Sequence, residues 1–339
     1  MLASLSHLLH ISASRLSLRI AGGVFTVPVF TLLAASTASS QTTNWTGEQS
    51  VDWNTAGNWD TNAVPSAGRV IINDDSANSA SASGVAFDGS RLDVGAAAGS
   101  SGSLELINGS DFQLTSAYIG TDGTGTLSVD NSLLTSSGTI YIGTRGSGTV
   151  IVSGSEAALS VTGSSSHLNI GDRENGNGNF EVLNGATVTV GNVALGNLSG
   201  SGSLTVDGAG SSLSITRRDL SAAGATGDVS ITVSNGGEID ILGTSGWLQL
   251  GSNADSVTRL LLTGEGSQIS STGYGLISEF GTVRARVEDQ AHLAVGTSLI
   301  LGASEDADGQ LVIDSEGSVD VAQATFVGLD GGHGTLTLS

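Results

Sequence analysis

The sequence predicts an all-β protein, a parallel β-solenoid in which short strands stack turn upon turn. An aliphatic residue followed by glycine recurs from Val94-Gly95 to Val327-Gly328, at intervals of about 26 residues that define about ten turns. The strands around these glycines alternate apolar and polar residues with a period of two, the pattern of a half-buried strand. Glycine contributes 50 of the 339 residues, which favours short strands joined by many turns.

Residues 1–38 are predicted to be a secretory signal peptide. Two arginines precede an apolar stretch at residues 20–35, which Pro28 interrupts, and small residues follow. This order is typical of a signal peptide. A membrane-spanning helix needs about 20 consecutive apolar residues, more than this stretch supplies. We expect cleavage after Ala38, with Ser40 as the nearby alternative, and therefore an exported chain.

Residues 39–84 have a composition of their own and form a predicted N-terminal cap segment. Three of the four tryptophans lie here, at Trp45, Trp53 and Trp59. Exposed tryptophans can stack on sugar rings, so these residues are candidates for glycan contact. Large aromatic side chains beside the first turn would also cover the open end of a solenoid, and we favour this second interpretation.

Residues 85–339 are the predicted repeat region. Each copy holds a strand, a turn such as Asn108-Gly109, a second short strand, and a third strand that ends in the aliphatic residue and glycine. The residues one and three places before the repeat glycine are predicted to point inward: Leu92, Val94, Ile140, Ile142, Leu168, Ile170, Val193, Leu195, Leu248, Leu250, Leu299 and Leu301. The residues between them are predicted to point outward: Asp93, Tyr141, Asn169, Ala194, Gln249 and Ile300. Two copies are degenerate, near Gly224 and near residues 278–281.

The last copy stops at Ser339, in the middle of a repeat. Because a bare terminal turn leaves strand edges and apolar side chains uncovered, we expect the solenoid to continue in a longer protein.

The charge and the absence of cysteine exclude several classes of function. The net charge is −21, and all 11 basic residues are arginine. This acidity argues against nucleic acid and anionic membranes as partners. The lack of cysteine excludes disulfides, thiolate zinc sites and cysteine nucleophiles.

The opening Trp45-Thr46-Gly47, Asp52-Trp53-Asn54 and Asn58-Trp59, followed by the aliphatic-glycine repeats, resembles the passenger domains of autotransporters of Gram-negative bacteria. The resemblance covers the whole chain, and other large secreted bacterial surface proteins share these features. It implies a right-handed β-helix displayed at the cell surface by type V secretion. The outer-membrane β-barrel translocator that it also implies is absent from this chain.

Catalytic motifs are sparse. The histidines of the mature chain, His167, His292 and His333, lie in three different copies, and no serine stands in a G-x-S-x-G elbow. The basic concentrations Arg217-Arg218-Asp219 and Arg284/Arg286 do not pair with carboxylates that repeat at the period of the solenoid. We therefore expect no enzymatic activity, no catalytic residue and no cofactor, and we expect an adhesin or a structural stalk. The alternative is a β-helical polysaccharide-degrading enzyme or a carbohydrate-binding surface protein.

One acidic loop is a weak candidate for binding a hard cation. Glu305, Asp306 and Asp308 place three carboxylates close together in the sequence. A solvated acidic turn is the interpretation that we favour, so no metal site is assigned. The partner remains an unknown extracellular surface, glycan or protein.

Overall fold

The computed structural model describes residues 13–20, 23–30, 41–73, 78–164, 167–222 and 227–339. The chain divides into two units, residues 1–39 and 40–339. In the first unit, β1 (Ala13–Ile20) pairs with β2 (Gly23–Phe30) in an antiparallel hairpin. The predicted cleavage site after Ala38, the alternative at Ser40 and the degenerate copy at Gly224 lie outside the described residues.

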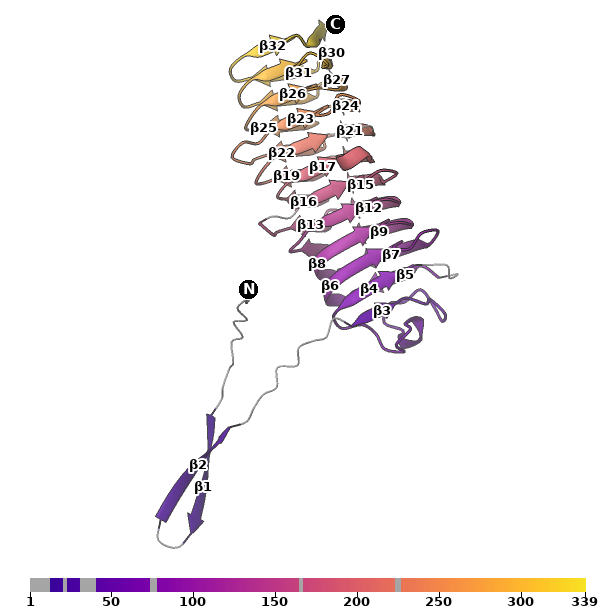
Figure 1. Ribbon diagram of the computed structural model, residues 1–339, viewed down its shortest axis with the longest axis vertical. Coiled ribbons are helices and arrows are strands. Elements are labelled where there is room, and N and C mark those ends of the chain that lie inside the picture. Colours follow the sequence, from indigo (N-terminus) through magenta and orange to yellow (C-terminus); the bar gives the residue numbers. More distant parts are fainter. Residues whose placement is uncertain (1–12, 21–22, 31–40, 74–77, 165–166, 223–226) are drawn as a thin grey trace, which may run out of the picture. The chain divides into compact units, whose positions relative to one another are not determined.

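The second unit is a parallel β-solenoid of about 11 turns, about 25 residues apart (Figure 1), so the predicted fold class is confirmed. The sequence predicted about ten turns of about 26 residues. The structure has one more because β5 (Ala80–Ser83) already belongs to the stack, ahead of residue 85.

The first sheet contains 11 strands in parallel. It consists of β5, β7 (Ser101–Ile107), β9 (Thr124–Asp130), β12 (Ser147–Ser153), β15 (Asn177–Leu183), β18 (Ser201–Asp207), β21 (Asp228–Ser234), β24 (Val257–Thr263), β27 (Thr282–Glu288), β30 (Asp308–Ile313) and β33 (His333–Leu338).

Two further parallel sheets complete the solenoid. The long strands β6 (Ala86–Val94) and β8 (Asp111–Ile119) belong to both of them. The second sheet continues with β10 (Leu133–Ser136), β13 (Ala158–Val161), β16 (Thr187–Val190), β19 (Ser212–Ile215), β22 (Glu238–Ile241), β25 (Gln268–Ser271), β28 (His292–Val295) and β31 (Ser318–Val321). The third sheet holds β3 (Thr42–Asn44), β4 (Arg69–Ile72), β11 (Ile140–Ile142), β14 (Leu168–Ile170), β17 (Val193–Leu195), β20 (Leu220–Ala222), β23 (Leu248–Leu250), β26 (Gly275–Ile277), β29 (Leu299–Leu301) and β32 (Thr325–Val327). Two short 3-10 helices, η1 (Ala56–Asn58) and η2 (Asn197–Ser199), lie in connections.

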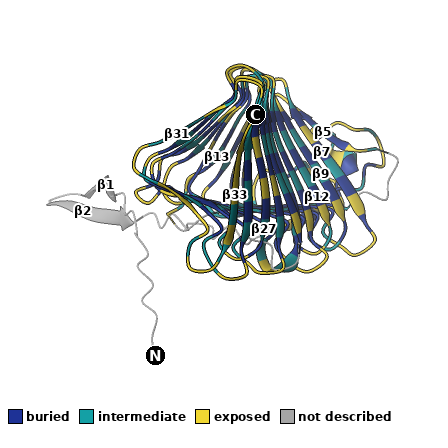
Figure 2. Cartoon of the chain, turned by 90° about the horizontal axis from the view of Figure 1, so that it is seen from above, coloured by how far each residue is buried: buried dark blue, intermediate teal, exposed yellow. Residues whose placement is uncertain are grey.

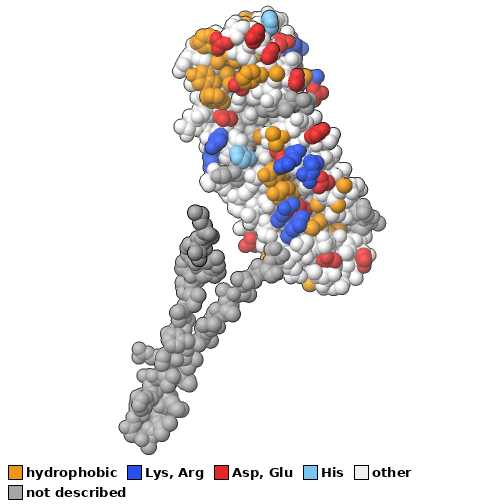
Figure 3. Space-filling model, viewed as in Figure 1, with side chains coloured by type: hydrophobic (Ala, Val, Ile, Leu, Met, Phe, Trp, Pro, Cys, Tyr) orange, Lys and Arg blue, Asp and Glu red, His pale blue; other side chains and the backbone are white. Residues whose placement is uncertain are grey.

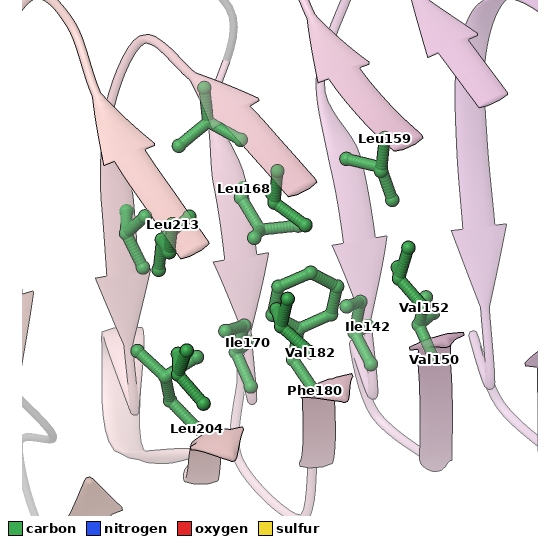
Figure 4. Packing of buried hydrophobic residues seen from close by; sticks show 14 of the residues in the cluster. Ile142, Val150, Val152, Leu159, Leu168, Ile170, Phe180, Val182, Leu204 and Leu213 are labelled. Carbon is green, nitrogen blue, oxygen red and sulfur yellow. The ribbon is translucent and has the colours of Figure 1, made fainter. Parts of the chain in front are cut away.

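The core is a set of aliphatic ladders inside the stack. Ile142 lies in register with Ile170 on the next turn (Figure 4). Ile170 lies in register with Leu195 on the turn after that. All the residues predicted to point inward are at most 2% exposed. Exposed residues gather at the turns, as the view along the stack shows (Figure 2). Because full burial of one such side chain contributes about 1.5–3 kcal/mol, the ladders are the main stabilising feature of the solenoid.

The repeat glycine is required by the backbone. Gly143 has a φ of 67°, in the left-handed region, and a Cβ placed there would lie 2.1 Å from the carbonyl oxygen of Asn177 on the next turn. Glycine alone satisfies both conditions without strain. The aliphatic-glycine motif therefore marks the corner at which each turn approaches its neighbour.

The degenerate copy near residues 278–281 keeps this corner without glycine. Ser278 stands in the equivalent place, with a φ of 73°, and is fully buried. Its hydroxyl donates a hydrogen bond to the carbonyl oxygen of Gly281. The serine therefore keeps the backbone geometry of the repeat, at the cost of a strained conformation.

Candidate functional site

The outer face of the third sheet presents one side chain per turn in a continuous row, which we call the outer row. Parallel pairing puts its members in register from turn to turn: Asp93, Tyr118, Tyr141, Asn169, Ala194, Ser221, Gln249, Leu276, Ile300 and Phe326. The side chains of the row are large and aromatic at Tyr118 and Tyr141, and they are much smaller at Asn169 and Ala194. This step creates a hollow on the surface.

Tyr118 and Tyr141 form a stacked pair. Their ring centroids are 4.8 Å apart and their planes differ by 16°. The guanidinium carbon of Arg91 lies 3.8 Å from the centroid of Tyr118, so the other face of that ring is covered by a cation. Burial, followed by the neighbouring Tyr118 and Asp172, raises the pKa of the Tyr141 hydroxyl above its ordinary value of 10.0. The Tyr141 hydroxyl therefore stays protonated near neutral pH and is available as a hydrogen-bond donor.

Asp93 is the member of the row directly below Tyr118. The sequence predicted correctly that it points away from the aliphatic core, yet it is 0% exposed. Arg69 Nε lies 2.8 Å from Asp93 Oδ2, and Arg91 Nε donates to the same oxygen at 2.7 Å. The two guanidinium groups cover the carboxylate and offset the cost of its burial.

The hollow has a volume of about 470 Å³ and lies beside the tyrosine pair. Its lining consists of Tyr118, Thr121, Tyr141, Thr144, Arg145, Asn169, Asp172, Arg173, Asn197 and Leu198. These residues come from β8, β11, β14 and the loops that follow each strand of the third sheet. On the face shown in Figure 3, arginine side chains gather in groups over the N-terminal half of the solenoid, with hydrophobic side chains between the groups.

A ladder of polar side chains forms the floor of the hollow. Thr121, Thr144, Asp172 and Asn197 each follow the repeat glycine directly, so the fold places them one above another. Asn197 Nδ2 donates a hydrogen bond of 2.9 Å to Asp172 Oδ1. The hydroxyl oxygens of Thr121 and Thr144 are buried and have no hydrogen-bond partner among the described residues.

Two arginines flank the hollow, and their roles differ. Arg145 forms a bidentate pair with Asp122, with distances of 2.6 Å and 2.9 Å, and this pairing lowers the pKa of the Asp122 carboxyl below 3.8. Arg173 lies 3.4 Å from Asp172 through Nε, and its side chain is 56% exposed. The carboxylate of Asp122 is thus already engaged, whereas Arg173 extends into solvent beside the hollow.

The three tryptophans that were candidates for glycan contact lie in the core. Trp45, Trp53 and Trp59 are 5%, 0% and 1% exposed, so none presents a flat ring face to a sugar. Their rings meet edge to face, and Trp53 also contacts Phe87 and Phe112 at 5.5 Å and 5.1 Å. This segment lies beside β3 and β4 at the N-terminal end of the stack (Figure 1). The burial agrees with the structural interpretation of this cluster.

The weak cation candidates do not assemble into a site. Asp308 is paired with Arg284 at 2.6 Å, while Glu305 and Asp306 lie on the turn before β30. Within the described ranges, no group of three or more histidine, cysteine or carboxylate side chains could hold a metal ion.

The three histidines lie on different turns, and two of them have local hydrogen bonds. His167 Nδ1 lies 2.9 Å from Asn192 Nδ2, and His292 Nδ1 lies 2.9 Å from Ser318 Oγ. His333 begins β33. His292 Nε2 also lies 3.7 Å from Asp320 Oδ2, so serine, imidazole and carboxylate groups meet on the outer side of β28 and β31, where the Asp320 side chain is 84% exposed.

The two groups of arginines noted in the sequence, around Arg217 and around Arg286, form hydrogen bonds and ion pairs that are separate from each other. Arg217 donates to the backbone carbonyls of Thr162 and Gly163. Arg286 pairs with Glu288 on its own strand and with Asp314 on the next turn. The contacts of Arg217 span two turns of the solenoid, whereas the pair of Arg286 with Asp314 links successive turns.

Sequence reasoning placed Tyr141 and Asn169 on the outer face but did not single out the hollow. The available signal was a tyrosine two places before the repeat glycine in successive copies, Tyr118 and Tyr141, which parallel pairing must stack. Thr144 and Asn197 follow the repeat glycine, so the same pattern could have found them, whereas the contribution of Arg173 depends on loop conformation, which the repeat pattern does not specify.

Comparisons of this chain with protein-family models, with curated proteins and with solved structures find no match.

Proposed function

We propose that the chain is an exported, noncatalytic solenoid of the autotransporter-passenger type, which works outside the cell as an adhesin or stalk. The observation that carries this proposal is the continuous aliphatic ladder through successive turns, exemplified by Ile142, Ile170 and Leu195. A stack of this kind is a stiff rod, because each turn is held by its neighbours. Its outer faces and loops are free to vary without disturbing the core.

The charge of the chain supports an extracellular role. A net charge of −21 with no lysine keeps a long repeat protein dispersed and makes binding to polyanions such as nucleic acid unfavourable. None of the helices in the described part of the chain has the length and hydrophobicity to cross a membrane.

Binding is favoured over polysaccharide cleavage at the hollow. A glycosidase needs two carboxyl groups at a fixed separation. Asp172 is the one carboxylate in the lining, and the nearby Asp122 is held by Arg145 with a lowered pKa, unlike a general acid. The lining offers hydrogen bonds and an aromatic ring, which suit recognition without chemistry.

Expression of the full chain in a Gram-negative host tests export. We expect the protein outside the cytoplasm with Ser39 as its first residue, as determined by N-terminal sequencing. Ala38→Phe is the matched control, because a bulky residue at this position blocks signal peptidase and should leave residues 1–38 attached. Cytoplasmic protein that begins at Met1 would overturn the proposal.

A further inference from the structure

The step in the outer row leaves one aromatic face open. Tyr118 is covered on one face by Arg91 and on the other by Tyr141. The next residue in register after Tyr141 is Asn169, followed by Ala194, both of which are much shorter than tyrosine. The hollow lies at this step, so the position that a third stacked ring would occupy is open.

The polar groups around that position include both hydrogen-bond donors and hydrogen-bond acceptors. Thr144 is 7% exposed, lines the hollow, and has a hydroxyl without a hydrogen-bond partner among the described residues. Buried polar atoms without partners are uncommon, so this hydroxyl is suited to a group that enters the hollow. Asp172 supplies acceptor oxygens, while Asn197 and Arg173 supply donors nearby.

We propose that the hollow is a saccharide-binding subsite that stacks one pyranose ring on the open face of Tyr141. A pyranose has an apolar C–H face suited to an aromatic ring, and ring hydroxyls that both donate and accept hydrogen bonds. Asp172 accepts from one hydroxyl, and Arg173 or Asn197 donates to its neighbour. The hydroxyl of Thr144 takes part from the floor.

The charge of the lining selects among saccharides. Arg145 is neutralised by Asp122, so Arg173 and Asp172 remain as one cation and one anion. Such a lining suits a neutral hexopyranose unit better than a highly sulfated glycan, which needs several unpaired cations. Beyond Asn169 the outer row continues as Ala194 and Ser221, which leaves room for further units of a chain along the solenoid.

This inference deepens the proposed function, because it names the ligand class of an exported rod. The experiment applies the mature chain, residues 39–339, to an array of neutral, carboxylated and sulfated oligosaccharides. The best-binding oligosaccharide is then titrated calorimetrically into the wild type, Tyr141→Ala, Thr144→Val and Tyr274→Ala. Tyr274 is the matched control, since it is a tyrosine on the surface, 38% exposed, that packs edge to face on Trp247 and does not line the hollow.

We expect binding of a neutral oligosaccharide, weakened at least tenfold by Tyr141→Ala and about threefold by Thr144→Val, and unchanged by Tyr274→Ala. Circular dichroism spectra and melting curves confirm that each variant is folded. No binding on the array, binding of sulfated glycans alone, or equal affinities for Tyr141→Ala and wild type would overturn the subsite. Export with cleavage after Ala38 would still stand in each of these cases, so the two proposals fail separately.

Discussion

The rings of Tyr118 and Tyr141 lie nearly parallel on adjacent turns, with centroids 4.8 Å apart. This distance matches the spacing of about 4.8 Å between parallel strands, so the pair is a direct product of the register. Arg91 completes the stack below Tyr118, and the stack ends at Tyr141 because Asn169 follows. The solenoid thereby turns a repeat position into a local binding surface.

The close approach at the repeat glycine makes a direct prediction for stability. Gly143→Ala adds a Cβ within 2.1 Å of the Asn177 carbonyl oxygen and should lower the free energy of unfolding by more than about 3 kcal/mol. Gly109→Ala is the control, because its φ of 76° is also left-handed but nothing lies within 4 Å of the added carbon. That variant should lose only about 1 kcal/mol. Equal losses in urea unfolding would contradict the steric explanation.

The strained corner at Ser278 predicts a comparison between two substitutions. Ser278→Gly and Ser278→Ala both remove the hydrogen bond to Gly281, but only glycine adopts a φ of 73° without strain. The glycine variant should therefore be more stable than the alanine variant by about 1 kcal/mol. Thermal melts of the two proteins measure this difference, and a more stable alanine variant would show that the corner is not strained.

The buried tryptophan cluster predicts a large loss of stability. Trp53 is 0% exposed and contacts Trp59, Phe87 and Phe112, so Trp53→Ala should cost about 3–5 kcal/mol. Trp247→Ala, at a half-buried position, should cost clearly less. Melting temperatures and the near-ultraviolet circular dichroism signal measure both effects. Unchanged melting of Trp53→Ala together with lost glycan binding would restore the sugar-contact interpretation.

His167 predicts a pH dependence of stability. Burial, and then the charge of Arg218, lower the pKa of this imidazole below 6.5. The stability contributed by the neutral ring is therefore fully present above about pH 6.5, the ordinary value, and is lost as the pH falls through the folded pKa. Between pH 7.5 and pH 5, the wild type should lose more stability in urea than His167→Gln. Identical slopes for the two proteins would rule out this contribution.

The repeat pattern was sufficient for the fold and insufficient for the site. Val193 and Leu195 could be assigned to the interior because alternation and the following glycine both determine which way a strand faces. The hollow depends on loops of unequal length, and on which residue follows each repeat glycine. Arg173 lies in such a loop, where the sequence gives no register, whereas Thr144 and Asp172 follow the repeat glycine and could have been placed from the sequence. The burial of Asp93 was also not predictable from the sequence, because it depends on the side chains of Arg69 and Arg91, which cover the carboxylate.

The chain contains three tyrosines, and this makes a single spectroscopic measurement decisive for the claim that the outer row binds saccharide. Tyrosine-labelled protein should give ring NMR signals for Tyr118, Tyr141 and Tyr274, which can be assigned with phenylalanine variants. On titration with the oligosaccharide selected from the array, we predict a large shift of the Tyr141 ring signals, a smaller shift for Tyr118 and none for Tyr274. A saturable shift confined to Tyr274, or no tyrosine shift when the oligosaccharide is bound, would contradict the account.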